Sequence, residues 1–211
     1  MQIKRIESTE AKTKKEKRNK ILMGIIISAI MIASTASFAF FSQEEDSSSK
    51  QKYNNFTFNK NGGFWQANSK GITVITIYLP QETENITCEK CNSANFNIFQ
   101  NKEVYFSVDS LIPNNAINEI GRNLKGIAKR MQYSCLQESE NSSFCIEQDL
   151  PVKTCPEDLY ASYFVFEFKQ LETNATKVLY SGSCITIEAK DSIEFAKAAD
   201  AFIFAASEIK K

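Results

Sequence analysis

A stretch of 21 consecutive uncharged residues constrains this chain more than any other feature of its sequence. Residues 21–41 read ILMGIIISAIMIASTASFAFF, and most of them are apolar. As a helix, a segment of this length spans the roughly 30 Å hydrocarbon core of a bilayer. We therefore expect residues 21–41 to form a transmembrane signal-anchor, which makes the lipid bilayer the first expected partner.

Charge is distributed unevenly on the two sides of this stretch. Residues 1–20 hold eight basic and three acidic side chains, a net charge of +5, whereas Glu44, Glu45 and Asp46 follow the stretch. The positive-inside rule places a basic flank in the cytoplasm. We expect a basic cytoplasmic arm at residues 1–20 and a C-terminal domain outside the cell membrane.

A signal peptide that is cleaved after export is the alternative interpretation. Residues 21–33 have the length of an apolar h-region, and Ser37 and Ala39 are small residues at the two positions that a signal peptidase recognises. The apolar character continues through Phe41, which favours the anchor. Both interpretations send the C-terminal domain across the membrane.

The composition excludes several classes of function. The chain has no histidine, so it cannot build a Ser-His-Asp triad, a Cys-His pair or a histidine-ligated metal site. Its total net charge is zero, so residues 42–211 carry −5, and they hold no basic patch dense enough to suggest nucleic-acid binding. We expect no nucleic-acid partner and no cofactor.

The remaining chain is predicted to be a short linker followed by one domain. Residues 42–52 are polar and rich in serine, which is typical of a flexible stalk. From residue 53 onward, strand patterns and helix patterns alternate, and Asn61-Gly62 indicates a hairpin turn. Strands are predicted at 55–58, 63–65, 72–79, 95–99, 104–108, 163–168, 178–180 and 184–188.

Two helices are predicted in this domain. One begins near Pro113 and carries apolar residues at helical spacing as far as Met131. The other begins at Asp191, which with Glu194 forms a capping-box pattern, and it is apolar around most of its circumference. The expected fold class is α+β, a largely antiparallel sheet with two packed helices, preceded by one N-terminal transmembrane helix.

Six cysteines lie in the domain expected outside the cytoplasm, and an even number there predicts three disulfides. Fifteen connectivities are formally available. Cys135 and Cys145 bracket one polar loop, and Cys155 ends a short strand while Cys184 begins another, so cross-strand pairing is plausible for these two. The proposed disulfide residues are Cys88, Cys91, Cys135, Cys145, Cys155 and Cys184.

The closely spaced pair Cys88 and Cys91 could be a redox dithiol, half of a zinc site or a structural disulfide. A redox dithiol needs a lowered thiolate pKa, which a helix N-terminus normally supplies, but the residues after Cys91 alternate like a strand. A zinc site needs four ligands, and the chain has no second Cys-x-x-Cys. We expect a structural disulfide and no metal site.

Two further kinds of site remain open in the sequence. Four N-glycosylation sequons occur, about as many as chance gives, and they support an exterior location only weakly. A carboxylate hydrolase would need a pocket with two facing acids of raised pKa, and no particular pair stands out. The candidate glycosylation residues are Asn55, Asn85, Asn141 and Asn174.

The C-terminal third resembles the closing portion of archaeal single-span membrane proteins with a small cysteine-containing α+β surface domain. The motifs are Val152-Lys-Thr-Cys155, Gly182-Ser-Cys184-Ile-Thr-Ile187 and Ala198-Ala199-Asp200, and the chain departs from the pattern at Ala201, where arginine is frequent. The resemblance implies an exported α+β domain and a Cys155–Cys184 pairing. It implies no activity, because none is established for that group.

The sequence as a whole suggests a tethered extracytoplasmic domain with a binding or envelope-structural role, and a protein partner at the cell surface. It identifies no catalytic residue. The alternative is a membrane-anchored thiol-disulfide oxidoreductase that uses Cys88 and Cys91.

Overall fold

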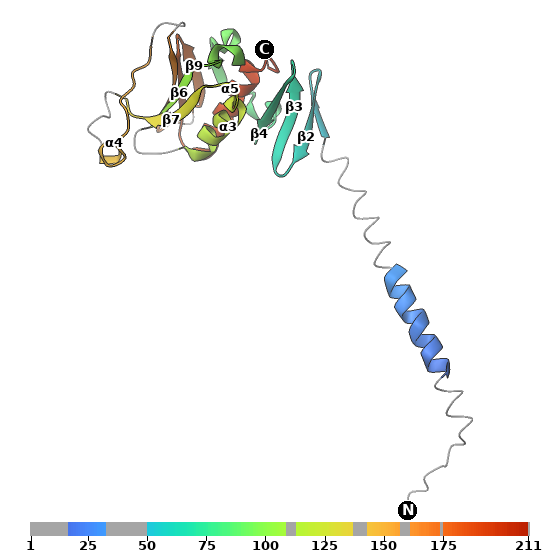
Figure 1. Ribbon diagram of the computed structural model, residues 1–211. Coiled ribbons are helices and arrows are strands. Elements are labelled where there is room, and N and C mark those ends of the chain that lie inside the picture. The colour runs from blue at the N-terminus through green and yellow to red at the C-terminus, as the bar shows by residue number, and fades with distance from the viewer. Residues whose placement is uncertain are drawn as a thin grey trace, which may run out of the picture. The chain divides into compact units, whose positions relative to one another are not determined.

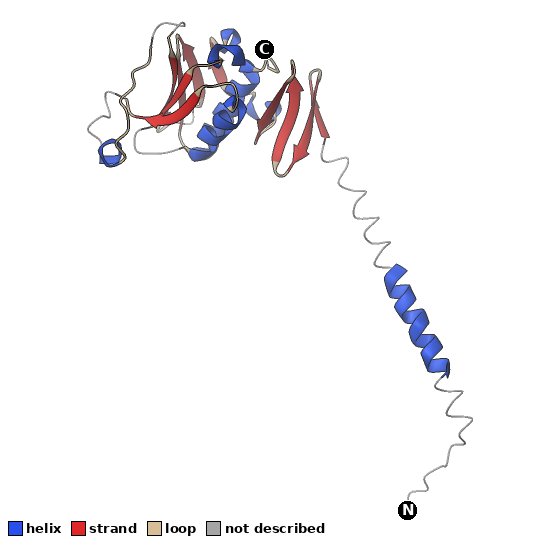
Figure 2. Ribbon diagram, in the orientation of Figure 1, coloured by secondary structure: helices blue, strands red, loops and turns tan. Residues whose placement is uncertain are grey.

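The computed structural model describes residues 17–32, 50–108, 113–136, 143–156, 161–173 and 175–210. The chain divides into two compact units, residues 1–49 and residues 50–211. Figure 1 shows the elements along the chain, and Figure 2 distinguishes the helices from the strands.

In the first unit, residues 17–32 form a helix. Within the described residues, no helix combines the length and apolarity needed to cross a membrane. Of the expected anchor at 21–41, residues 21–32 belong to this helix, and residues 33–41 lie outside the described part. Residues 1–16 of the expected basic arm and residues 42–49 of the expected stalk also lie outside it.

The second unit begins with a four-stranded antiparallel sheet. Each strand pairs with the next one in sequence, in the order β1-β2-β3-β4. The turn between β2 and β3 is Gly62-Gly63, one residue later than the expected turn, and both glycines adopt positive φ angles that other residues rarely adopt. The strands are β1 (Lys50–Tyr53), β2 (Phe56–Asn61), β3 (Phe64–Ser69) and β4 (Ile72–Thr76).

One boundary of the expected stalk is corrected by this sheet. The polarity of residues 50–52 predicts that they belong to the stalk, but they pair with β2 as part of β1. Their polarity reflects an edge strand whose side chains are exposed, and lysine is common on such edges.

The second sheet has six strands in the order β5-β9-β10-β8-β6-β7. Only the β9–β10 pair is antiparallel, and the other four pairs are parallel. The expectation of one largely antiparallel sheet is therefore wrong for this half of the domain. The strands are β5 (Thr87–Glu89), β6 (Glu103–Ser107), β7 (Arg130–Ser134), β8 (Tyr163–Gln170), β9 (Lys177–Ser181) and β10 (Cys184–Ala189).

Two helices pack against each other within this unit, as the sequence predicts. The helix α3 (Asn114–Leu124) connects β6 to the parallel strand β7, and it ends before the expected Met131 because Gly126 turns the chain with a φ of 83°. The helix α5 (Ser192–Ala206) begins at Asp191, whose carboxylate accepts hydrogen bonds from the N–H groups of Ile193 and Glu194.

Shorter helices fill the connections. Residues 95–99 were predicted to be a strand, but Asn95 caps a 3-10 helix that carries Phe96 and Phe99 into the core. The short helices are η1 (Pro80–Thr83), η2 (Cys91–Ser93), η3 (Phe96–Phe99) and α4 (Ser143–Glu147).

The helices α3 and α5 lie between the two sheets, so the second unit has three layers (Figure 1). On one side of α5, Phe202 packs against Phe99 and Phe166, with ring centroids 6.2 and 5.4 Å apart. On the other side, Phe204 meets Phe58 of β2 at 5.9 Å. A helix that contacts a sheet on both sides must be apolar all around, which explains its composition.

Candidate functional site

The six cysteines form three disulfides, which confirms the expectation of disulfide bonding. Cys88–Cys91 joins β5 to η2. Cys135–Cys145 clips the segment between β7 and α4, and Cys155–Cys184 ties the segment 151–156 to the beginning of β10. These are the same three pairs that the sequence suggests.

The Cys88–Cys91 pair lies in surroundings that do not activate a thiol. Cys91 is 1% exposed and belongs to the hydrophobic core, and Cys88 is half-buried against that core. The helix that begins at Cys91 is a single 3-10 turn of three residues, too short to present a substantial dipole. Attack on the Cys91 sulfur by another thiol would require this turn to leave the core.

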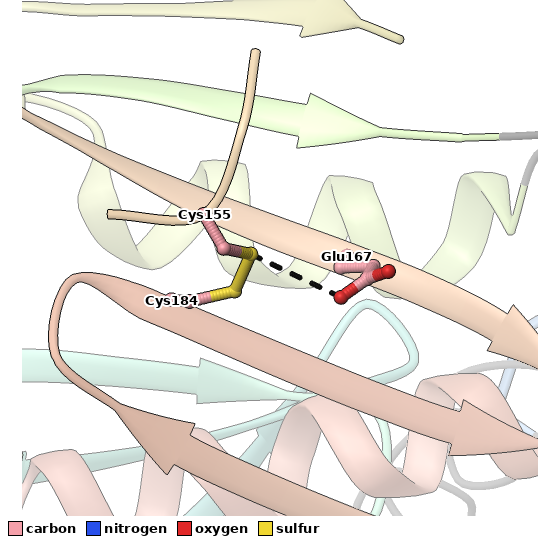
Figure 3. A group of neighbouring side chains, drawn as sticks. All are labelled: Cys155, Glu167 and Cys184. Carbon is pink, nitrogen blue, oxygen red and sulfur yellow. Dashed lines mark hydrogen bonds between the residues drawn. A yellow bond between two sulfur atoms is a disulfide. The ribbon is translucent and has the colours of Figure 1, made fainter. Parts of the chain in front are cut away.

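A second disulfide lies beside a buried carboxylate on the face of the larger sheet that points away from the helices. Cys155, Glu167 and Cys184 place their ligand atoms within 4.8 Å of one another (Figure 3). The pairing of β8 with β10 sets this arrangement, because Glu167 lies opposite Thr186 and Cys184 lies opposite Val165.

Glu167 is 6% exposed, and both of its carboxylate oxygens have partners. The Thr186 hydroxyl donates to Oε2 at 3.1 Å, and the Lys169 ammonium lies 2.8 Å from Oε1. The Sγ atom of Cys155 lies 3.9 Å from Oε2, which is a van der Waals contact because a disulfide sulfur carries no proton. The carboxylate is therefore compensated, as a buried charge must be.

These three residues have the donor types of a metal site, two sulfurs and one carboxylate. With the sulfurs joined to each other, neither is the thiolate that binds zinc. The arrangement in this structure is a disulfide packed on a neutralised carboxylate. Glu167 is not among the site residues that the sequence predicts, although it is the one acidic residue in the otherwise aromatic and aliphatic run 163–168.

The segment 151–156 lies across this same face of the sheet. The backbone N–H of Lys153 donates to the carbonyl oxygen of Cys135 at 2.7 Å. The Lys153 ammonium lies over the rings of Tyr105 and Tyr163, 4.6 and 4.9 Å from their centroids. The Cys155–Cys184 disulfide holds the C-terminal end of the segment. Two cation–π contacts and a cross-link thus fix a short strap to the sheet.

A second cluster lies in the helical layer, where Glu119 of α3 and Asp200 of α5 are both 0% exposed. Burial raises the pKa of Glu119, although its hydrogen bond from Arg122 acts in the opposite direction. Burial also raises the pKa of Asp200 well above its usual range, and the negative charge of Glu119 adds to that increase. This is a pair of carboxyl groups with perturbed pKa values, which the sequence could not identify.

The carboxyl pair does not open into the neighbouring surface pocket. That pocket, of about 430 Å³, is lined by Arg122, Asn123 and Lys125 among others, and neither acid belongs to its lining. A hydrolase needs both carboxyl groups within reach of a substrate. The arrangement therefore holds elements together and offers no access to a sugar or an ester.

Two of the four candidate glycosylation residues lie in the described part of the chain. Asn55 lies in the turn between β1 and β2, and not in a strand as expected, and Asn85 lies in the turn after η1. Both are exposed. Asn141 and Asn174 lie outside the described residues. The two described sequons are thus sterically accessible to a modifying enzyme.

Comparison of the chain with protein-family models, with curated proteins and with solved structures finds no match.

Proposed function

We propose that this protein is a membrane-tethered domain that lies outside the cytoplasm and has a binding or envelope-structural role. The observation that carries the proposal is the uncharged stretch at 21–41 between a basic arm and an acidic flank. Within the described helix at 17–32, apolar side chains such as Ile21, Met23 and Ile32 are 58%, 67% and 70% exposed. Exposed apolar side chains in such a row favour burial in lipid.

The three disulfides support the location of the second unit. Disulfides form and persist in oxidising compartments, and they are rare in a reducing cytoplasm. All six cysteines of the chain are paired. The resemblance of the C-terminal third to archaeal single-span surface proteins points in the same direction.

The disulfide chemistry favours a structural or binding role over the oxidoreductase alternative. Cys88, the more accessible of the two cysteines, lies in strand β5 and is followed by a single 3-10 turn, so no helix dipole stabilises a thiolate there. The Cys155–Cys184 bond fixes a strap whose removal would uncover a sheet face bearing Tyr105 and Tyr163. For the binding role, we propose a protein partner at the cell surface.

The tether is tested by placing charge in the apolar helix. The double substitution Ile26→Lys and Ile30→Lys is expected to move the full-length chain from the membrane fraction to the soluble or aggregated fraction. Each central lysine disfavours insertion by about 2.5–3.5 kcal/mol. In the unsubstituted protein, a C-terminal tag should be digested by protease added outside intact cells.

The matched control is the pair Ile146→Lys and Ile193→Lys, which makes the same chemical change at two exposed positions of the second unit. That variant should stay in the membrane fraction. The proposal fails if both double variants distribute alike, or if the tag is digested only after the membrane is opened.

A further inference from the structure

The last strand of the smaller sheet is held by side chains from both helices. Asp200 of α5 accepts hydrogen bonds at Oδ2 from the backbone N–H groups of Ile77 and Tyr78, at 3.1 and 2.8 Å. These two residues directly follow β4. The Asp200 carboxyl group thus binds the end of β4 while it is itself completely buried.

Each buried acid has one oxygen without a partner. Among the described residues, Oδ1 of Asp200 and Oε2 of Glu119 are the two buried side-chain polar atoms that lack a hydrogen bond. The Oε1 atom of Glu119 is 2.5 Å from an Arg122 guanidinium nitrogen. The backbone N–H of Ile77 donates to Asp200 and also acts to lower the pKa of Glu119, so both acids lie near this one amide.

The charges at this place do not balance if both acids are ionised. Arg122 supplies one positive charge, and two carboxylates would supply two negative ones. An isolated buried charge is strongly unfavourable, and a buried group instead retains or loses a proton. Arg122 bonds directly to Glu119, so the ionised member is Glu119 and the proton resides on Asp200.

We propose that Asp200 is protonated in the folded protein and donates its Oδ1–H to Oε2 of Glu119, so that one proton latches the end of β4 to α3 and α5. This arrangement satisfies both unpartnered oxygens at once. It also explains how two completely buried acids coexist when only one guanidinium bonds to the pair.

The latch is sensitive to pH, and the groups around Asp200 decide whether its pKa is raised or lowered. Glu119 and Arg122 face Asp200 from α3, and Tyr78 faces it from the segment after β4. Lys197 of α5 lies 5.8 Å from the Tyr78 ring, and Glu82 and Glu194 also act on that tyrosine. The net effect raises the pKa of Asp200, because burial and the negative charge of Glu119 outweigh the contribution of Arg122.

A carboxyl group with a raised folded pKa stabilises the fold most below its unfolded pKa, which is about 3.9 for aspartate. As the pH rises above that value, the unfolded chain loses the proton and the folded chain keeps it. The unfolding equilibrium constant then increases about tenfold per pH unit until the folded pKa is reached.

The decisive variant is Asp200→Asn, which replaces the protonated acid by a neutral group of the same shape. Its oxygen can accept from Ile77 and Tyr78, and its NH₂ group can donate to Glu119. Urea unfolding of the full-length protein in detergent, with disulfides intact, is followed by the fluorescence of Trp65 in β3. The variant should lose most of the pH dependence above about pH 4 and should unfold less readily than the wild type at pH 7.

Two further measurements complete the test. Glu119→Gln should also flatten the upper part of the profile, because a neutral amide donor lets Asp200 ionise closer to its ordinary pKa. The exposed Glu89→Gln should retain the wild-type profile. Infrared spectroscopy of the wild type at neutral pH should show a protonated carboxyl band that Asp200→Asn removes.

The proposal is overturned if the wild type shows no protonated carboxyl band at neutral pH. It is equally overturned if Asp200→Asn keeps the wild-type pH dependence. Because the infrared measurement uses the unsubstituted protein, a variant that fails to fold does not leave the question open.

Discussion

At the scale of single residues, the amide of Asn123 takes the place of a neighbouring strand beside β4. Its Oδ1 accepts from the N–H of Ile75 at 2.9 Å, and its Nδ2 donates to the C=O of the same residue at 2.6 Å. Two opposing hydrogen bonds to one residue are the pattern of an antiparallel strand pair. Asn123 therefore closes a sheet edge that would otherwise keep unpaired backbone groups.

Replacing Asn123 by alanine should destabilise the domain by roughly 2–4 kcal/mol, because it leaves two backbone groups of Ile75 without partners. Urea unfolding monitored at Trp65 measures the change. Asn68→Ala is the matched control, since that side chain accepts one bond from Gly71 at the surface, and it should cost about 1 kcal/mol or less. Equal losses in the two variants would refute the role assigned to Asn123.

At the scale of elements, the sequence predicts α5 well because its signals are local. Asp191 and Glu194 mark the start, and the apolar circumference indicates burial on all sides. The sequence predicts an end of α3 beyond the observed Leu124, because Ile127 and Met131 continue the helical spacing of apolar residues. Met131 in fact packs from β7, after Gly126 has ended the helix.

Pairing between distant elements could not be predicted in the same way. The parallel register of β8 with β10 brings Glu167 to Cys184, and the crossing of α3 and α5 brings Glu119 to Asp200. Strand patterns specify which side of a strand is apolar and leave its neighbour undefined. The sequence can predict the cysteine pairs because two of the three disulfides join cysteines that are close in sequence.

The double-sided packing of α5 leads to a prediction for its aromatic residues. Phe202→Ala should destabilise the protein by about 3–5 kcal/mol, since it leaves a cavity against Phe99 and Phe166. Ile193→Ala, on the exposed part of the same helix, should change stability by less than about 0.5 kcal/mol. Thermal or urea unfolding of both variants distinguishes these outcomes, and a similar cost at both positions would contradict the three-layer packing.

At the scale of the whole molecule, the disulfides differ in how much of the chain they constrain. Cys155 and Cys184 are 29 residues apart in sequence, whereas Cys88 and Cys91 are three apart. In the chain-entropy model, a disulfide stabilises a protein by restricting its unfolded state, and a longer loop gives a larger effect.

Removing Cys155–Cys184 by the double substitution to alanine should therefore cost about 4 kcal/mol, against about 2 kcal/mol for the double substitution at Cys88 and Cys91. The free energies of unfolding in urea provide the comparison. Limited proteolysis should in addition cut the first variant within 151–156, where the strap has lost its covalent attachment. An equal cost for the two variants would show that native contacts, and not loop length, decide the effect.

The central position of β10 also imposes an order on folding. Strands β1 to β4 each pair with the next strand in sequence, so this meander can form from local contacts early. The larger sheet cannot do so, because β10 joins β9 to β8, and α5 covers it only afterwards. A chain that is synthesised or exported from its N-terminal end must therefore carry unpaired strand edges until β10 is available, and such edges are prone to aggregation during that interval.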